Sequence, residues 1–91
     1  LTAGETYLIH FLGPDDAEKF MKTVEASPHV SAAALLPKPA QANRPIFYAK
    51  EGHPKTIAQV HDAFESMMGS RFKRYQNVAA KLPSSVMSYT E

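Results

Sequence analysis

The chain has 91 residues, so its length fits one small domain, and a domain of this size buries only roughly 60–65% of its unfolded surface. Its 44% hydrophobic and 21% charged residues argue against disorder, and its net charge of +1 provides no strong field toward nucleic acid or an anionic membrane. The absence of cysteine excludes disulfides, thiolate metal sites and cysteine nucleophiles.

Two elements are predicted before Pro28. Residues 6–12 are rich in β-branched and aromatic side chains and end at Gly13, a pattern typical of a strand. Residues 15–26 are predicted to form an amphipathic helix, because their apolar side chains recur at helical spacing and acidic residues occupy the first turn.

The middle of the chain is predicted to contain two further strands. Residues 29–36 are apolar and alternate, although their consecutive alanines would also suit a helix; the prolines on either side leave too little length for one. Residues 38–44 are predicted to be a loop. Residues 45–51 form the third strand, which Gly52 ends.

The last third is predicted to contain two helices and a strand. An apolar stripe begins at Ile57 and continues to Gly69, which would serve as the C-cap. A second helical pattern follows from Ser70 to Pro83, and residues 84–90 close the chain as a strand.

This order, strand-helix-strand-strand-helix-helix-strand, predicts one α+β domain over residues 1–91. We expect a ferredoxin-like sandwich, with a four-stranded antiparallel sheet and all helices on one face. The open face would carry apolar side chains such as Leu8, Leu12 and Ile46, with His10 and Tyr48. Because such a face is too apolar for water on a small monomer, we predict a homodimer packed through the sheets.

Several segments resemble the dimeric α+β barrel superfamily, which includes antibiotic-biosynthesis-type monooxygenases, stress-responsive barrel proteins and small polyketide cyclases. Ser27-Pro28-His29-Val30 resembles its turn into the second strand. Ser70, Phe72 and Tyr75 resemble, with one spacing a residue short, the start of a later helix, and Val86-x-x-Tyr89 resembles the end of its last strand. The chain has no Trp, which some of those oxygenases use.

The resemblance implies a cavity between sheet and helices that binds a small apolar or aromatic, polyketide-like molecule. It leaves open whether that molecule is turned over. If it is, His61 or His10 would act as the general base, with Tyr48 holding a carbonyl and no cofactor or metal required. We expect the substrate to contact four further aromatic side chains: Tyr7, Phe47, Phe64 and Tyr75.

Each of these residues also has a structural interpretation. His61 could be a helix-surface residue, His10 could lie in the dimer seam, and the tyrosine hydroxyls could bond to backbone. The basic residues from Arg71 to Arg74 are expected on the solvated face of a helix, with Phe72 and Tyr75 toward the core.

Two alternative functions remain open. One is a non-catalytic module whose open face docks onto itself or another protein. The other is an RNA recognition motif, which residues 63–69 resemble in its second helix, although the aromatic platform for RNA is mostly missing and we do not expect a nucleic-acid partner. No apolar run is long enough for a bilayer and no signal peptide is visible, so we expect a cytoplasmic protein. Because the chain starts at Leu1, we expect a processed protein or a domain cut from a longer one.

Overall fold

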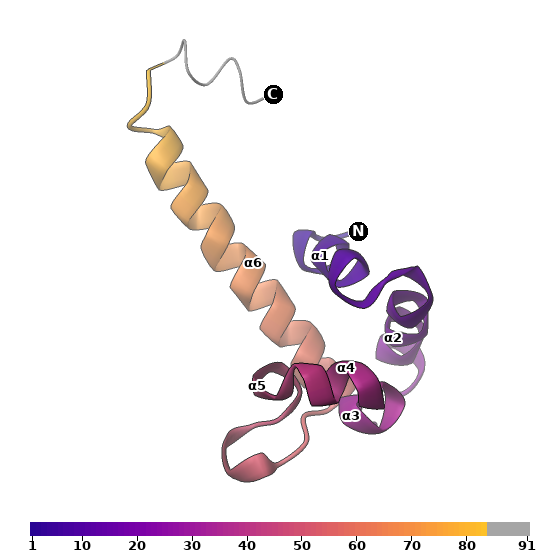
Figure 1. The fold of residues 1–91 in the computed structure, drawn as a ribbon. Coiled ribbons are helices and arrows are strands. Elements are labelled where there is room, and N and C mark those ends of the chain that lie inside the picture. The colour runs from indigo at the N-terminus through magenta and orange to yellow at the C-terminus, as the bar shows by residue number, and fades with distance from the viewer. Residues whose placement is uncertain (84–91) are drawn as a thin grey trace.

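In a computed structural model, which describes residues 1–83, the chain is helical (Figure 1). The elements are α1 (Ala3–Leu12), α2 (Pro14–Ala26), α3 (Ala32–Leu35), α4 (Pro37–Ala42), α5 (Arg44–Phe47), a 3-10 turn η1 (Lys50–Gly52) and α6 (Ile57–Ala79). The helix predicted at 15–26 is confirmed as α2, with Pro14 at its first position. The strand predicted at 84–90 lies outside the described residues.

The predicted sandwich, and with it the resemblance to dimeric α+β barrels and to RNA recognition motifs, is wrong. Residues 1–83 contain no sheet; their only β pairings are two isolated bridges, Ser31 with Thr56 and Tyr48 with Pro54. Within residues 1–83 there is therefore no open sheet face for a homodimer or docking partner, no space between sheet and helices for a substrate, and no sheet platform for RNA.

Residues 6–12 belong to a helix because a capping box precedes them. The Thr2 hydroxyl accepts a hydrogen bond from the Glu5 backbone N–H at 3.1 Å, and the Glu5 carboxylate accepts one from the Thr2 N–H at 2.9 Å. This exchange satisfies two otherwise unpaired donors at the start of α1. Along the helix Thr6 and His10 are exposed and Leu8 is buried, which is a helical rather than an alternating pattern.

The predicted strands at 29–36 and 45–51 are replaced by short helices. α3 is a single turn capped by Ser31, whose hydroxyl accepts from the Ala34 N–H at 3.2 Å. A proline lies in the first turn of each of the next two helices: Pro37 is the first residue of α4, which occupies the predicted loop, and Pro45 is the second residue of α5. A helix this short is not stable alone, and tertiary packing supports it, since α3, α4 and α5 each bury a residue in the core.

The two helices predicted after Ile57 are one continuous helix. A second capping box, between Thr56 and Gln59, begins α6. Gly69 does not end it, and the helix continues to Ala79. Its 23 residues correspond to a length of about 35 Å.

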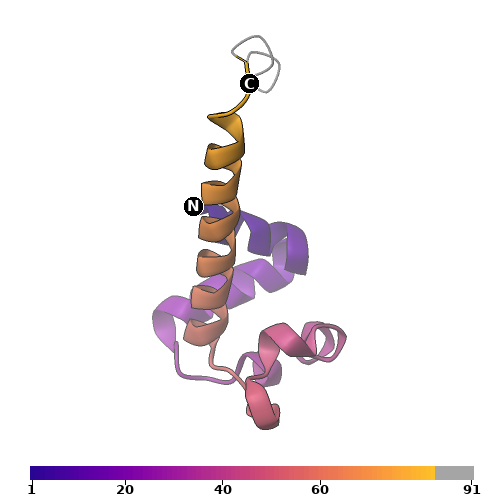
Figure 2. The ribbon, with the colours of Figure 1, turned by 90° about the vertical axis from the view of Figure 1, so that its left-hand side faces the viewer.

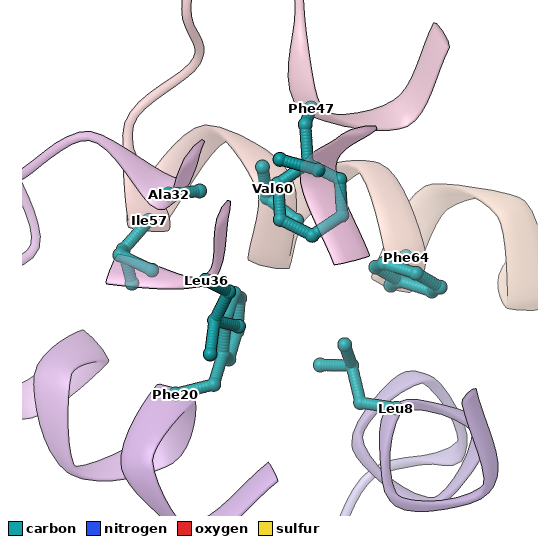
Figure 3. Packing of buried hydrophobic residues seen from close by; sticks show 9 residues of the cluster. Leu8, Phe20, Ala32, Leu36, Phe47, Ile57, Val60 and Phe64 are labelled. Atoms are coloured by element: carbon teal, nitrogen blue, oxygen red, sulfur yellow. The ribbon is translucent and has the colours of Figure 1, made fainter. Parts of the chain in front are cut away.

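The core lies between the first half of α6 and the helices around it (Figure 3). α1 makes the most extensive contact with α6, α2 packs against both, and α5 covers another side near its start. Phe20, Phe47 and Phe64 are the largest fully buried side chains. The buried cluster consists of Leu8, Phe20, Ala32, Leu36, Ala40, Phe47, Ile57, Val60 and Phe64.

The second half of α6 extends beyond this core. Figures 1 and 2 show it rising away from the other helices, with the N-terminal helix beside its middle. The radius of gyration, 15.9 Å, exceeds the about 12 Å expected for a compact chain of this length. The projecting half of α6 therefore makes the described molecule elongated rather than compact.

Candidate interaction surface

His61 lies in a small polar cluster between α1 and α6. Its Nε2 is 3.0 Å from Oε2 of Glu5, and the two side chains are 18% and 17% exposed. The Thr2 backbone N–H, and next the His61 hydrogen bond, hold the pKa of the Glu5 carboxyl below its usual value. Glu65, one turn beyond His61, is hydrogen-bonded by the Thr2 hydroxyl. These contacts attach the start of α1 to α6.

The other two residues predicted to be catalytic lie elsewhere. His10 is exposed on α1, and Tyr48 is half-buried after α5, where the Arg44 guanidinium lies 4.2 Å from its ring centroid. No hydrogen bond in residues 1–83 joins either of them to His61. The structure therefore does not assemble the three into one site, and their acid–base roles stay predictions.

The four aromatic residues predicted to bind substrate fall into different environments. Phe47 and Phe64 are core residues. Tyr7 is half-buried on α1, with its ring 5.8 Å from that of Phe64. Tyr75, in contrast, is 53% exposed on α6. Their contact with a substrate stays a prediction.

The exposed half of α6 carries an apolar stripe. Its side chains are Phe72, Tyr75, Val78 and Leu82, which are 58%, 53%, 52% and 41% exposed. With a rotation of about 100° per residue, all four lie on the same face of the helix. The expectation that Phe72 and Tyr75 face the core is therefore wrong. We call these four residues the α6 stripe.

The α6 stripe continues the face of the same helix that packs on the core. By helical rotation Tyr75 and Leu82 lie almost directly above Ile57 and Phe64, which are buried. The stripe can be extended to half-buried Met68 and Ala79, which gives the alternating spacing of four and three residues found in the seam of a coiled coil. Among the described residues, the face that α1 and α5 cover along the first half of α6 thus has no helix covering it along the second half.

Basic side chains accompany the stripe. Residues 69–83 contain four basic residues and no acidic one, whereas residues 1–68 contain six basic and eight acidic residues. Arg74 and Lys81 lie along one flank of the stripe, and Lys73 lies on the back of the helix. Arg71 lies between Val78 and Leu82 within the stripe, and its guanidinium is 5.6 Å from the ring centroid of Tyr7 on α1. We call Arg71, Arg74 and Lys81 the basic row.

A half-open apolar pocket lies below the basic row, where α5 meets α6. Its volume is about 120 Å³, and Lys55 is the charged residue at its wall. By helical rotation Ala63 and Met67 lie on the same flank of α6 as Arg74 and Lys81. We call it the Ile46 pocket; it is lined by Pro45, Ile46, Lys55, Ala63, Phe64 and Met67.

Comparison with protein-family models found no match for this chain. In the part of the chain that the structure describes, no cluster of His, Asp and Glu side chains is suited to hold a metal ion. Among the same residues, none of the helices combines the length and apolar character needed to traverse a bilayer.

The exposed stripe could not be distinguished from a core face by sequence alone, because its apolar spacing is the same in either case. One signal was available: the segregation of charge, with acidic residues confined to the first part of the described chain and basic residues dense after Gly69.

Proposed function

We propose that this chain is a helical docking module that uses the second half of α6 to bind an α-helix of another protein. The proposed partner helix has apolar side chains at coiled-coil spacing and an acidic flank. Helices α1 to α5 hold the first half of α6 and leave its second half projecting. The observation that carries the proposal is the continuation of the core-facing stripe of α6 beyond the helices that cover it.

The apolar area supports a protein partner. Four large exposed side chains in succession on one helix face form a contiguous patch, and such patches on soluble proteins commonly mark interaction sites. A helix fits best, because the spacing of Phe72, Tyr75, Ala79 and Leu82 matches knobs-into-holes packing.

The charge supports a partner that differs from this chain. Two copies paired along their stripes would bring Arg71, Arg74 and Lys81 of each into one interface, and residues 69–83 offer no acidic residue to face them. Like charges in that position oppose association. An acidic row on the partner would instead face Arg71, Arg74 and Lys81.

The proposal can be tested with a labelled synthetic helix that has leucines at coiled-coil spacing and glutamates on its flanks. We expect fluorescence anisotropy to show binding that weakens as salt screens the charge pairs. The variant Phe72→Ser/Tyr75→Ser should weaken it at least about tenfold, since buried aromatic residues dominate such interfaces. Gln76→Ser/Asn77→Ser, on the same helix but off the stripe, should leave it unchanged.

Three results would contradict the proposal. The first is equal binding of the acidic peptide by both variants. The second is preference for a peptide in which lysines replace the glutamates. The third is that the wild-type chain binds neither peptide, and instead self-associates or binds anionic vesicles through Phe72 and Tyr75.

A further inference from the structure

We propose that the Ile46 pocket is the second contact of the same interface and receives one apolar side chain of the partner helix, with a carboxylate of that helix on Lys55. This inference rests on the proposed docking function and names where the partner helix ends. The pocket has room for a side chain rather than for a larger ligand, with a volume of about 120 Å³.

The first argument is alignment. Ala63 and Met67, which form the α6 wall of the pocket, lie on the flank of the helix that carries Arg74 and Lys81 farther along. From Met67 to Phe72 is five residues, or about 7.5 Å along the axis. A helix that packs on the side of the α6 stripe next to Arg74 and Lys81, and continues along this flank toward the core by about one and a half turns, therefore reaches the Met67 wall of the pocket.

The second argument is the composition of the pocket. Its walls are apolar, from Pro45 and Ile46 on the α5 side and Phe64 and Met67 on the α6 side. Lys55 is half-buried, and the contacts in residues 1–83 show no carboxylate paired with it. An ammonium group next to an apolar recess suits an apolar side chain that has a carboxylate one turn away.

The third argument is that Lys55 has a defined position. Its backbone N–H donates to the Phe47 carbonyl at 2.9 Å, and its carbonyl accepts from the Ala32 N–H at 3.0 Å. Phe47 and Ala32 are both buried in the core. The Lys55 backbone is therefore held by the core on both sides, so the loop before α6 presents its side chain at a fixed place.

The test is a scan of the acidic peptide in which each leucine in turn is replaced by alanine. We expect one leucine near the end of the peptide to lose about tenfold in affinity for the wild-type chain. The Ala63→Leu variant fills the pocket, so replacing that leucine of the peptide by alanine should have little effect on its affinity for this variant. Met67→Ala, which widens the pocket instead, serves as a second variant if Ala63→Leu does not fold.

The carboxylate is tested by a double-mutant cycle between Lys55→Met and glutamate→glutamine at each flanking peptide position. One glutamate should couple to Lys55 by about threefold or more, and the coupling should fall with added salt. Gln41→Met, exposed on α4, is the matched control.

The outcomes separate the two proposals. If the wild-type chain binds the peptide through Phe72 and Tyr75, but no leucine is sensitive to the filled pocket and no glutamate couples to Lys55, the pocket inference is wrong and the docking function stands. If Phe72→Ser/Tyr75→Ser has no effect on binding, both proposals fail.

Discussion

At the residue scale, the polar contacts between α1 and α6 determine how the N-terminal helix is attached. Glu5 has two roles there, since it caps its own helix and accepts a hydrogen bond from His61 across the interface. His61 is engaged as a structural partner of Glu5, and its imidazole does not line the pocket found beside α5.

We expect the stability of the chain to decrease in acid in part through Glu5. Its pKa is lowered in the folded state, so its contribution is present above the unfolded value of about 4.5 and is lost as the pH falls through the lower folded pKa. Glu5→Gln keeps the capping geometry but not the charge. Urea unfolding should show a loss of roughly 0.5–1 kcal/mol at neutral pH.

The same variant should also have a flatter pH dependence below about pH 4.5 than the wild type, because the charge that titrates there is gone. Glu25→Gln, exposed near the end of α2, is the matched control and should follow the wild type. An unchanged acid profile for Glu5→Gln would show that the contact does not link α1 to α6.

Two glycines provide a second prediction at this scale. A Cβ on Gly4 would collide with the Glu65 carboxylate and lie 3.0 Å from the Glu65 Cα, whereas a Cβ on Gly69 would meet nothing within 4 Å. We expect Gly4→Ala to destabilise the chain by about 1–2 kcal/mol, because overpacking outweighs the gain in helix propensity.

Gly69→Ala should have the opposite effect and stabilise the chain by up to about 1 kcal/mol, since Gly69 is interior to α6. Circular dichroism during thermal unfolding measures both changes. A loss of stability in Gly69→Ala would mean that this glycine ends a helix, as the sequence had suggested, and would divide α6 into two.

At the element scale, α6 combines two roles along one face. Its first half is buried by α1, α2 and α5, and its second half is exposed although it carries the same apolar spacing. A face of this kind contributes to folding in one half and is available for association in the other.

Paired alanine substitutions should separate the two halves. Phe64→Ala, in the core, should cost about 3–5 kcal/mol of the free energy of unfolding, because it leaves a cavity. Phe72→Ala should change it by less than about 0.5 kcal/mol, because the side chain is exposed. Similar losses for the two variants in chemical unfolding would show that the second half of α6 is also packed in solution.

At the scale of the whole molecule, shape and charge are segregated together. The core and the acidic residues lie in one part of the described chain, and the projecting helix is basic. The homodimer was predicted from an apolar sheet face, and residues 1–83 contain no sheet that could pair in this way.

We expect light scattering at low salt to give the mass of a single chain, 10.0 kDa, because the basic segments of two copies repel. A dimer at low salt that Phe72→Ser/Tyr75→Ser separates would identify the α6 stripe as a self-association surface. That result would contradict a partner of a different kind.

Part of this arrangement is accessible from local sequence. Residues 15–26 were predicted as a helix because apolar spacing, Pro14 and first-turn carboxylates agree, and the structure confirms this. The helical pattern on both sides of Gly69 was also correct. Two further signals were present but were not used in the prediction: Thr2-x-x-Glu5 and Thr56-x-x-Gln59 are capping boxes, and the first precedes the segment whose aromatic and β-branched residues suggested a strand.

The sequence by itself thus determined the apolar spacing, the caps and the separation of charge, all of which depend on neighbours within a few residues. Only the tertiary structure decided that α3 to α5 are helices, because such short helices form only when Ala32, Ala40 and Phe47 are buried by the rest of the chain. It also decided which half of the α6 face is covered. Periodicity specifies that a face is apolar, but whether another helix reaches it depends on contacts between residues far apart in the sequence.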